Sequence, residues 1–148
     1  MSESFNKVIL LVEDNEDDVF LTEMAFAKAG CKNAMRVVTD GEEAVNYLAG
    51  EGAFANRDQH PFPSLVLLDL KLPYRSGLEI LGWMGSNGMI GKTTIAVLTS
   101  SNQPNDLKRA YELGTNTYLV KPPTPQAIHD IKRAFNLDWL KCNESSSC

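Results

Sequence analysis

The chain has 148 residues, the size of one ordinary domain with a hydrophobic core of its own. Its 14 basic and 19 acidic residues give a net charge of −5, and there is no run of lysine or arginine, so a nucleic-acid-binding face is not expected. No apolar stretch approaches the roughly 20 residues of a membrane span, and the first residues carry no positively charged leader, so we expect a cytoplasmic protein that is neither exported nor membrane-spanning.

Short apolar runs alternate with segments of helical periodicity along the chain. This pattern is typical of repeated strand–helix units that build a parallel sheet with helices on both faces. Five units are present, with expected strands at 7–12, 34–38, 64–69, 94–98 and 116–120. The expected helices are 16–29, 41–49, 78–86, 104–113 and a last one that opens at Thr124 or Pro125, bears Phe135 and can extend to Trp139.

Residues at the helix ends support these boundaries. Three acids at 16–18 suit the positive N-terminus of the first helix, and Gly30 is placed to end it. Asp40 can cap the second helix while Glu43, three residues on, returns the hydrogen bond. These local signals agree with the periodicity.

The segment 50–63 separates the second helix from the third strand. It is too rich in glycine and proline for regular structure. Because it carries Phe54 and Phe62, we expect an ordered surface excursion whose aromatic rings pack against the body of the domain.

Residues suited to phosphoryl chemistry stand where four of the strands end: Glu13, Asp14, Asp69, Thr99 and Lys121. Each has an ordinary explanation by itself, since an acid after a strand is usually a helix cap and a lysine before proline is usually solvated. Parallel strands, however, bring their carboxyl ends to one edge of the sheet. Carboxylates ~4 Å apart repel by a few kcal/mol per pair, so a cluster stays ionised only when a cation joins it. The joint placement indicates a metal-assisted phosphoryl acceptor.

Four motifs occur in order and with suitable spacing, and together they resemble the receiver domain of two-component response regulators. They are Leu-Val-Glu-Asp-Asn at 11–15, Leu-Leu-Asp-Leu-Lys-Leu-Pro at 67–73 with Gly77 beyond, Val-Leu-Thr-Ser-Ser at 97–101 and Tyr-Leu-Val-Lys-Pro at 118–122. The resemblance covers about 7–140. It implies a flavodoxin-like α/β fold, with a doubly wound five-stranded parallel sheet in the order 2-1-3-4-5 flanked by five helices.

The resemblance also implies a role for each strand-end residue. Asp69 would be the phosphoacceptor, which attacks a phosphohistidine on a sensor histidine kinase. Glu13 and Asp14 would hold Mg²⁺ together with Asp69 and the backbone carbonyl of Lys71, an oxygen set that this ion prefers. Lys121 would reach the phosphoryl group from the other side.

Further residues would bind the phosphoryl group and couple its arrival to a change at the protein surface. The resemblance gives the Thr99 hydroxyl a hydrogen bond to a phosphoryl oxygen, and small Ser100 leaves an entry path. Tyr118 would shift its ring with Thr99 and alter the face of the fourth helix, fifth strand and fifth helix, although an ordinary strand aromatic is the alternative. Lys71 and Ser101 would tune the lifetime of the phosphoryl group.

We expect an N-terminal extension at 1–6, a receiver domain at 7–140 and a C-terminal tail at 141–148. No effector domain is expected, and the loop before strand three resembles that of small regulators that pair with phytochrome-type histidine kinases. That likeness implies a light-responsive kinase as phosphodonor and a homodimer through the fifth-helix region. Trp139 and Leu140 would either meet a partner or fold back onto the domain.

Three cysteines, Cys31, Cys142 and Cys148, form no C-x-x-C pair and predict neither a disulfide framework nor a zinc site.

Two other functions are possible on a fold of this class, and each needs residues that this chain lacks. A Mg²⁺-dependent phosphatase acting through an aspartyl phosphate needs a second acid where Lys71 stands, so no enzyme is expected. A flavin carrier needs a phosphate loop where the chain has acids at 13–18. If the chain is a response regulator, it can act as an output protein, as a phosphorelay intermediate or as a phosphate sink, and the sequence does not distinguish these roles.

Overall fold

The computed structural model describes residues 7–100 and 104–142, and within them five parallel strands lie in the order β2-β1-β3-β4-β5. The strands are β1 (Ile9–Val12), β2 (Met35–Val38), β3 (Leu65–Asp69), β4 (Thr94–Thr99) and β5 (Thr117–Val120). The helices are α1 (Glu16–Lys28), α2 (Gly41–Ala49), α3 (Gly77–Ser86), α4 (Pro104–Leu113) and α5 (Pro125–Ala134). The predicted fold class and strand order are confirmed. In the described part of the chain, no helix is both long and apolar enough to cross a membrane.

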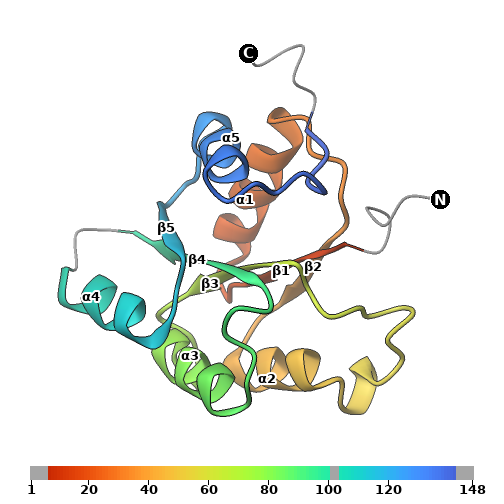
Figure 1. Cartoon of the computed structure of the whole chain (residues 1–148), viewed down its shortest axis with the longest axis vertical. Helices are drawn as coiled ribbons and strands as arrows, with labels where there is room; N and C mark the ends of the chain where they lie inside the picture. Colours follow the sequence, from red (N-terminus) through yellow and green to blue (C-terminus); the bar gives the residue numbers. More distant parts are fainter. Residues whose placement is uncertain (1–6, 101–103, 143–148) are drawn as a thin grey trace.

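Helices cover both faces of the sheet, α1 and α5 on one side and α2, α3 and α4 on the other (Figure 1). Side chains alternate between the faces along each strand. Leu11 and Leu67 therefore belong to the core under α1 and α5, whereas Val12 and Leu68 belong to the core under α2, α3 and α4. The same alternation continues past the strand ends, so it decides toward which side each functional residue points.

The register of the ladder brings the strand ends together. Val12 lies opposite Leu68, so the next residues along the two strands are neighbours. Asp69 pairs with Leu98 across the β3–β4 ladder. The backbone N–H of Lys121 donates a 2.7 Å hydrogen bond to the carbonyl of Thr99, which extends the β4–β5 ladder by one step. All the predicted strand-end residues are thereby placed along one edge of the sheet.

The loop 50–63 is ordered, as predicted, but one part of the prediction is wrong. Gly52–Phe54 forms a short 3-10 helix, η2, although the glycine content argued against regular structure. Phe54 and Phe62 are half-buried against the core under α2 and α3, as expected. The Phe54 ring lies 5.0 Å from that of Tyr47, and this aromatic contact gives η2 a surface to pack on.

The chain after α5 also differs from the expectation. The predicted extension of the last helix to Trp139 is wrong, because Phe135 is the C-cap and Asn136 adopts a left-handed backbone with φ of 54°. The chain then folds back, so that Leu137 is buried and Leu140 is only 1% exposed in the core under α1 and α5. The alternative in which these residues return to the domain is correct for Leu140, and Trp139 packs against the same core.

Close contact between β3 and α3 depends on a glycine. A Cβ at Gly77 would lie 2.5 Å from the carbonyl oxygen of Asp69 and 2.7 Å from Cα of Leu70, both parts of the backbone. Gly77→Ala is expected to lower the free energy of unfolding by about 2 kcal/mol, since the helix must move away from the strand. Urea unfolding measures this loss.

A matched control lies in the same helix. A Cβ at Gly82 meets nothing within 4 Å, so Gly82→Ala should raise stability by about 0.5–1 kcal/mol through helix propensity alone. Equal effects of the two substitutions would contradict the proposed backbone clash at Gly77.

Candidate functional site

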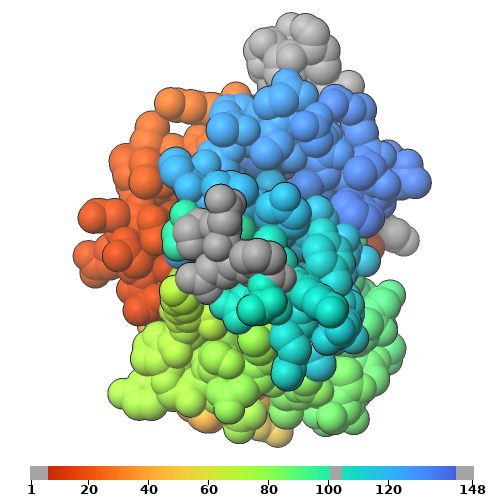
Figure 2. Space-filling view, turned by 90° about the vertical axis from the view of Figure 1, so that its left-hand side faces the viewer, coloured from red at the N-terminus to blue at the C-terminus, as the bar shows by residue number. Residues whose placement is uncertain are grey.

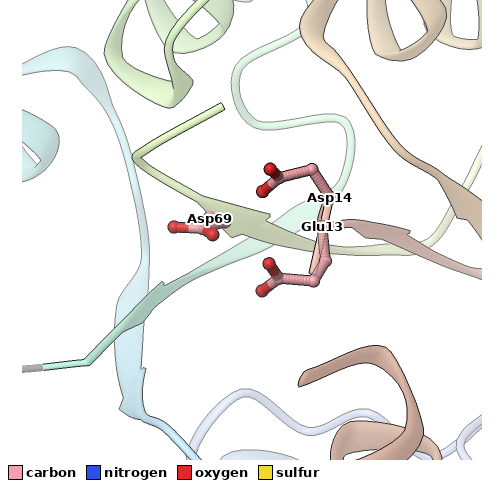
Figure 3. A group of neighbouring side chains, drawn as sticks. All are labelled: Glu13, Asp14 and Asp69. Atoms are coloured by element: carbon pink, nitrogen blue, oxygen red, sulfur yellow. The ribbon is translucent and has the colours of Figure 1, made fainter. Parts of the chain in front are cut away.

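Three carboxylates gather where β1 and β3 end. Glu13, Asp14 and Asp69 each offer an oxygen, and these oxygens all lie within 4.8 Å of one another. Figure 3 shows Glu13 and Asp14 on opposite sides of the chain after β1, with Asp69 at the end of β3 between them in that view. Glu13 and Asp69 are buried, and Asp14 is exposed. The sequence-based prediction that these carboxylates lie together is supported by this geometry.

Lys121 places one ammonium among these acids. Its Nζ lies 2.9 Å from Oε1 of Glu13 and 3.0 Å from Oδ2 of Asp69. The alternation along the strands explains this grouping, because all three side chains follow the strands toward the α1 and α5 side. Only 11% of the lysine side chain is exposed, so solvent screens the contacts little. The lysine thus offsets the repulsion between two buried carboxylates.

The electrostatics of the site follow from burial and from this single cation. Burial and, to a smaller extent, the charge of Asp69 raise the pKa of Glu13 to about 7, against the opposing pull of the Lys121 ammonium. Burial alone would lower the pKa of Lys121, but the carboxylates of Glu13, Asp69 and Asp18 outweigh it and raise that pKa. Near neutral pH the lysine is charged, while Glu13 is only partly ionised.

Asp18 is a site residue that its sequence pattern predicts only as an acid at a helix start. Its Oδ2 lies 3.1 Å from Nζ of Lys121. Asn15 caps α1 by accepting a hydrogen bond from the backbone N–H of Asp18, which places Asp18 in the first turn beside the sheet edge. The sequence feature that could have identified Asp18 is its position. An acid in the first helical turn after the pair Glu13 and Asp14 lies close to the edge of the sheet that carries the site.

A pocket opens next to Asp69. It is lined by residues at or just after the ends of β3 and β4 and by one residue of α4, among them Lys71, Thr99, Ser100 and Asp106. The backbone N–H of Lys71 donates a 3.0 Å hydrogen bond to Oδ1 of Asp69, which fixes the orientation of the carboxylate. Thr99 and Ser100 therefore lie where the prediction put them, and Asp106 was not predicted. Ser101 lies outside the described residues.

Tyr118 lies on β5 with its side chain on the surface, 42% of the residue being exposed. It lines a groove against α5 together with Ile131 and Phe135. Tyr111 of α4 and Val120 of β5 are also exposed. Figure 2 shows this side of the molecule, with α4 in teal between α5 in blue and α3 in green. An exposed ring on β5 has room to change its position, and the switch role of Tyr118 remains a prediction.

The donor set suits a hard divalent cation. Oε1 of Glu13 is fully buried, yet among the described residues it accepts no well-aligned hydrogen bond, although Lys121 is near. The Lys121 ammonium contacts this oxygen from one side at 2.9 Å, and a carboxylate has further acceptor positions that a metal ion can use. Carboxylate oxygens are the ligands that Mg²⁺ prefers, and the exposed Asp14 leaves a side open for retained waters. The residues present therefore fit Mg²⁺.

Known proteins are similar to this chain over nearly its whole length. Residues 9–133 match the family model described as response regulator receiver domain. Response regulator Rcp1 from Synechocystis sp. is 32% identical over 143 residues, 95% of each chain. A solved Mn(2+)-bound form of Rcp1 has a TM-score of 0.71 at 31% identity and covers 91% of this chain and 95% of its own.

Two further solved structures are similar over nearly the whole chain. The bacteriophytochrome response regulator AtBRR has a TM-score of 0.80 and 39% identity, covering 93% of this chain and 97% of its own. The phosphorylated cyanobacterial phytochrome response regulator RcpA has a TM-score of 0.72 and 34% identity, covering 90% of this chain and 93% of its own.

Proposed function

Because the chain belongs to the response regulator receiver domain family, we propose that it accepts a phosphoryl group on Asp69 from a sensor histidine kinase. The observation that carries this proposal is the carboxylate of Asp69, which is 3.0 Å from the Lys121 ammonium and opens on a pocket lined by Thr99 and Ser100. A nucleophile, a fixed cation and a hydroxyl donor converge there, as phosphoryl transfer requires.

The transfer step is a displacement at phosphorus. An oxygen of Asp69 forms the new O–P bond while the N–P bond to the kinase histidine breaks, and its electron pair returns to the imidazole nitrogen. The Lys121 ammonium holds a phosphoryl oxygen, and the Thr99 hydroxyl donates a hydrogen bond to another. Small Ser100 keeps the entrance to the pocket open. These groups orient the phosphoryl group without reacting with it.

Glu13, Asp14 and Asp69 would hold Mg²⁺, with the backbone carbonyl of Lys71 as the fourth protein ligand. The ion, when bound, supplies positive charge that offsets the charge of the phosphoryl oxygens. Lys71 is among the residues that line the same pocket, and its side chain would hinder the hydrolytic water and lengthen the life of the acyl phosphate. In this proposal the chain is a regulator and not a phosphatase, since Lys71 stands where a phosphatase needs its general acid.

The phosphorylated chain would act on its target through the face formed by α4, β5 and α5. Phosphorylation would draw Thr99 toward the phosphoryl group and let the exposed ring of Tyr118 turn inward, which changes the groove against α5.

We propose a cytoplasmic homodimer that contacts neither nucleic acid nor membrane, with the exposed Tyr111 and Val120 on this face available for subunit contact. Sedimentation with and without beryllofluoride tests this, and a monomer under both conditions would contradict the dimer.

The names of the relatives AtBRR and RcpA support a phytochrome-type kinase as the phosphodonor. The test is phosphotransfer from an autophosphorylated phytochrome-type kinase and, in parallel, from acetyl phosphate. We expect both donors to load at most one phosphoryl group per chain, and EDTA to stop the reaction. Labelling by acetyl phosphate alone would keep the acceptor function and exclude this kinase class. Return of the label to the kinase would favour the role of a phosphate sink. Transfer of the label to a histidine phosphotransfer protein would favour the role of a relay intermediate.

Protons and Mg²⁺ should compete for Glu13. The pKa of Glu13 lies at about 7, above its usual value of 4.5, so below pH 7 the metal must displace a proton. The apparent affinity for Mg²⁺ should therefore rise about tenfold between pH 6 and pH 8 and then level off. Isothermal titration calorimetry in buffers of different ionisation enthalpy measures both the affinity and the released proton.

Two variants control this pH dependence. Glu13→Gln should bind Mg²⁺ more weakly and with little change between pH 6 and pH 8, because the titrating group is gone. Asp17→Asn removes an exposed acid four residues away, in the first turn of α1, and should keep the wild-type slope. A flat pH profile for the unaltered protein would show that Glu13 does not bind the metal.

A further inference from the structure

Two cysteines that are far apart in the sequence lie side by side in the fold. Sγ of Cys31 and Sγ of Cys142 are 2.6 Å apart, although 111 positions separate them along the chain. Both residues are half-buried, and both are free thiols. The separation exceeds the length of an S–S bond, ~2.05 Å, by only about 0.6 Å. No spacing motif in the sequence pairs them.

The backbone holds both cysteines in place. Cys31 follows α1 and donates a 3.0 Å hydrogen bond from its N–H to the carbonyl of Phe26, so the end of the helix fixes it. Lys32 donates a 2.9 Å hydrogen bond to the carbonyl of Lys141. Lys141 in turn donates to the side chain of Asn33 at 2.8 Å. The residue next to each cysteine is thus bonded across to the other segment, which sets the two thiols in register.

Burial holds the second segment against the first. After α5 the chain passes through Leu137 and Leu140, both buried in the core beneath α1 and α5. Figure 1 shows this dark-blue segment reaching the C-terminal end of α1. The thiols meet because the fold brings them together, so little backbone movement is required to join them.

We propose that Cys31 and Cys142 form a redox-active thiol pair that is oxidised to an intramolecular disulfide by low-molecular-weight disulfides such as glutathione disulfide. One thiolate attacks the glutathione disulfide, forms a mixed disulfide and releases one glutathione thiolate. The second cysteine sulfur, having lost its proton, attacks the bonded protein sulfur and releases the second glutathione. The protein thiols lose two protons and two electrons, and one glutathione disulfide becomes two thiols.

Burial, followed by the contact with Cys142, raises the pKa of the Cys31 thiol, so a reduced pair is favoured until an oxidant reaches it. The disulfide would tie the segment after α5 to the end of α1 and close a loop of more than a hundred residues.

This pair is separate from the phosphoryl site. α1 begins at the edge of the sheet that carries Asp69 and runs back along the sheet to Cys31, which precedes β2. Oxidation should therefore leave phosphorylation of Asp69 by acetyl phosphate unchanged. The failure of this inference and the failure of the proposed function are for that reason distinguishable.

The experiment uses the full chain with Cys148→Ser, so that only the pair remains, incubated in glutathione buffers of increasing oxidation. We expect the loss of two thiols, a mass lower by two hydrogen atoms, a peptide linking Cys31 to Cys142, and a melting temperature higher by at least about 5 °C that dithiothreitol reverses. The further variants Cys31→Ser and Cys142→Ser should each bind one glutathione instead and gain no thermal stability.

Three outcomes would overturn the proposal. The first is a protein that takes up two separate glutathione adducts. The second is a pair that stays reduced in glutathione disulfide alone. The third, in the chain that retains Cys148, is a disulfide linking Cys148 to either member of the pair.

Discussion

Asp69→Asn should abolish phosphoryl incorporation, with a loss of at least about 1,000-fold in the rate of labelling by acetyl phosphate. The amide has nearly the same shape as the carboxylate but lacks the negative oxygen that attacks phosphorus. The hydrogen bond from the Lys71 N–H to Oδ1 can persist in the variant, so the backbone at the end of β3 should keep its place. Intact-mass spectrometry after incubation with acetyl phosphate and Mg²⁺ measures the loss.

The matched control for this variant is Asp17→Asn. Asp17 is an exposed acid in the first turn of α1, so the change removes the same charge near the same edge of the sheet. It should leave the extent of labelling unchanged. Retained label in Asp69→Asn would place the acceptor elsewhere and refute the central assignment, whereas equal losses in both variants would point to a general effect of charge.

Lys121→Met should cost about 3 kcal/mol of stability at pH 8 without Mg²⁺ and should also slow phosphorylation strongly. The substitution leaves Glu13 and Asp69 buried with no cation between them, and the cost of breaking a buried ion pair is of this order. Asp18, which also contacts the ammonium, loses its partner as well. Urea unfolding with and without Mg²⁺ measures the effect, and added Mg²⁺ should restore part of the stability.

The pH dependence of the Lys121→Met deficit has a definite sign. Glu13 has a pKa of about 7 in the fold and an ordinary value of 4.5, so its contribution to stability is complete below 4.5 and is lost as the pH rises through 7. Without the lysine charge that pKa rises further. The deficit should therefore be largest above pH 7 and shrink toward pH 5. Replacement of the exposed Lys108 by Met should show no such trend.

The sequence was informative about the site because parallel strands have a simple geometry. Residues that directly follow buried strands share one edge of the sheet whatever the details of packing. Glu13, Asp69 and Lys121 could therefore be placed together before any coordinates, and the structure brings them within ion-pair distance. The family motifs added their chemical roles, including those of Thr99 and Tyr118, which geometry alone does not assign.

Where the sequence analysis fell short, contacts between distant segments decided the structure. Asp18 was read as a favourable charge at a helix start, but its contact with Lys121 depends on how α1 turns against the sheet. The last helix was predicted to reach toward Trp139. A periodic pattern cannot show that a left-handed residue at Asn136 ends the helix and that Leu140 then finds a place in the core.

The sequence by itself determined the fold class, the strand order through its family motifs, and the residues that form the edge of the sheet. It did so because burial imposes a period of two on strands and of 3.6 on helices, and both periods are local. Only the tertiary structure decided that Asp18 joins Glu13 and Asp69 around Lys121 and that Cys31 meets Cys142. Those contacts depend on the packing of whole elements across more than a hundred residues of chain, and no local pattern encodes that distance.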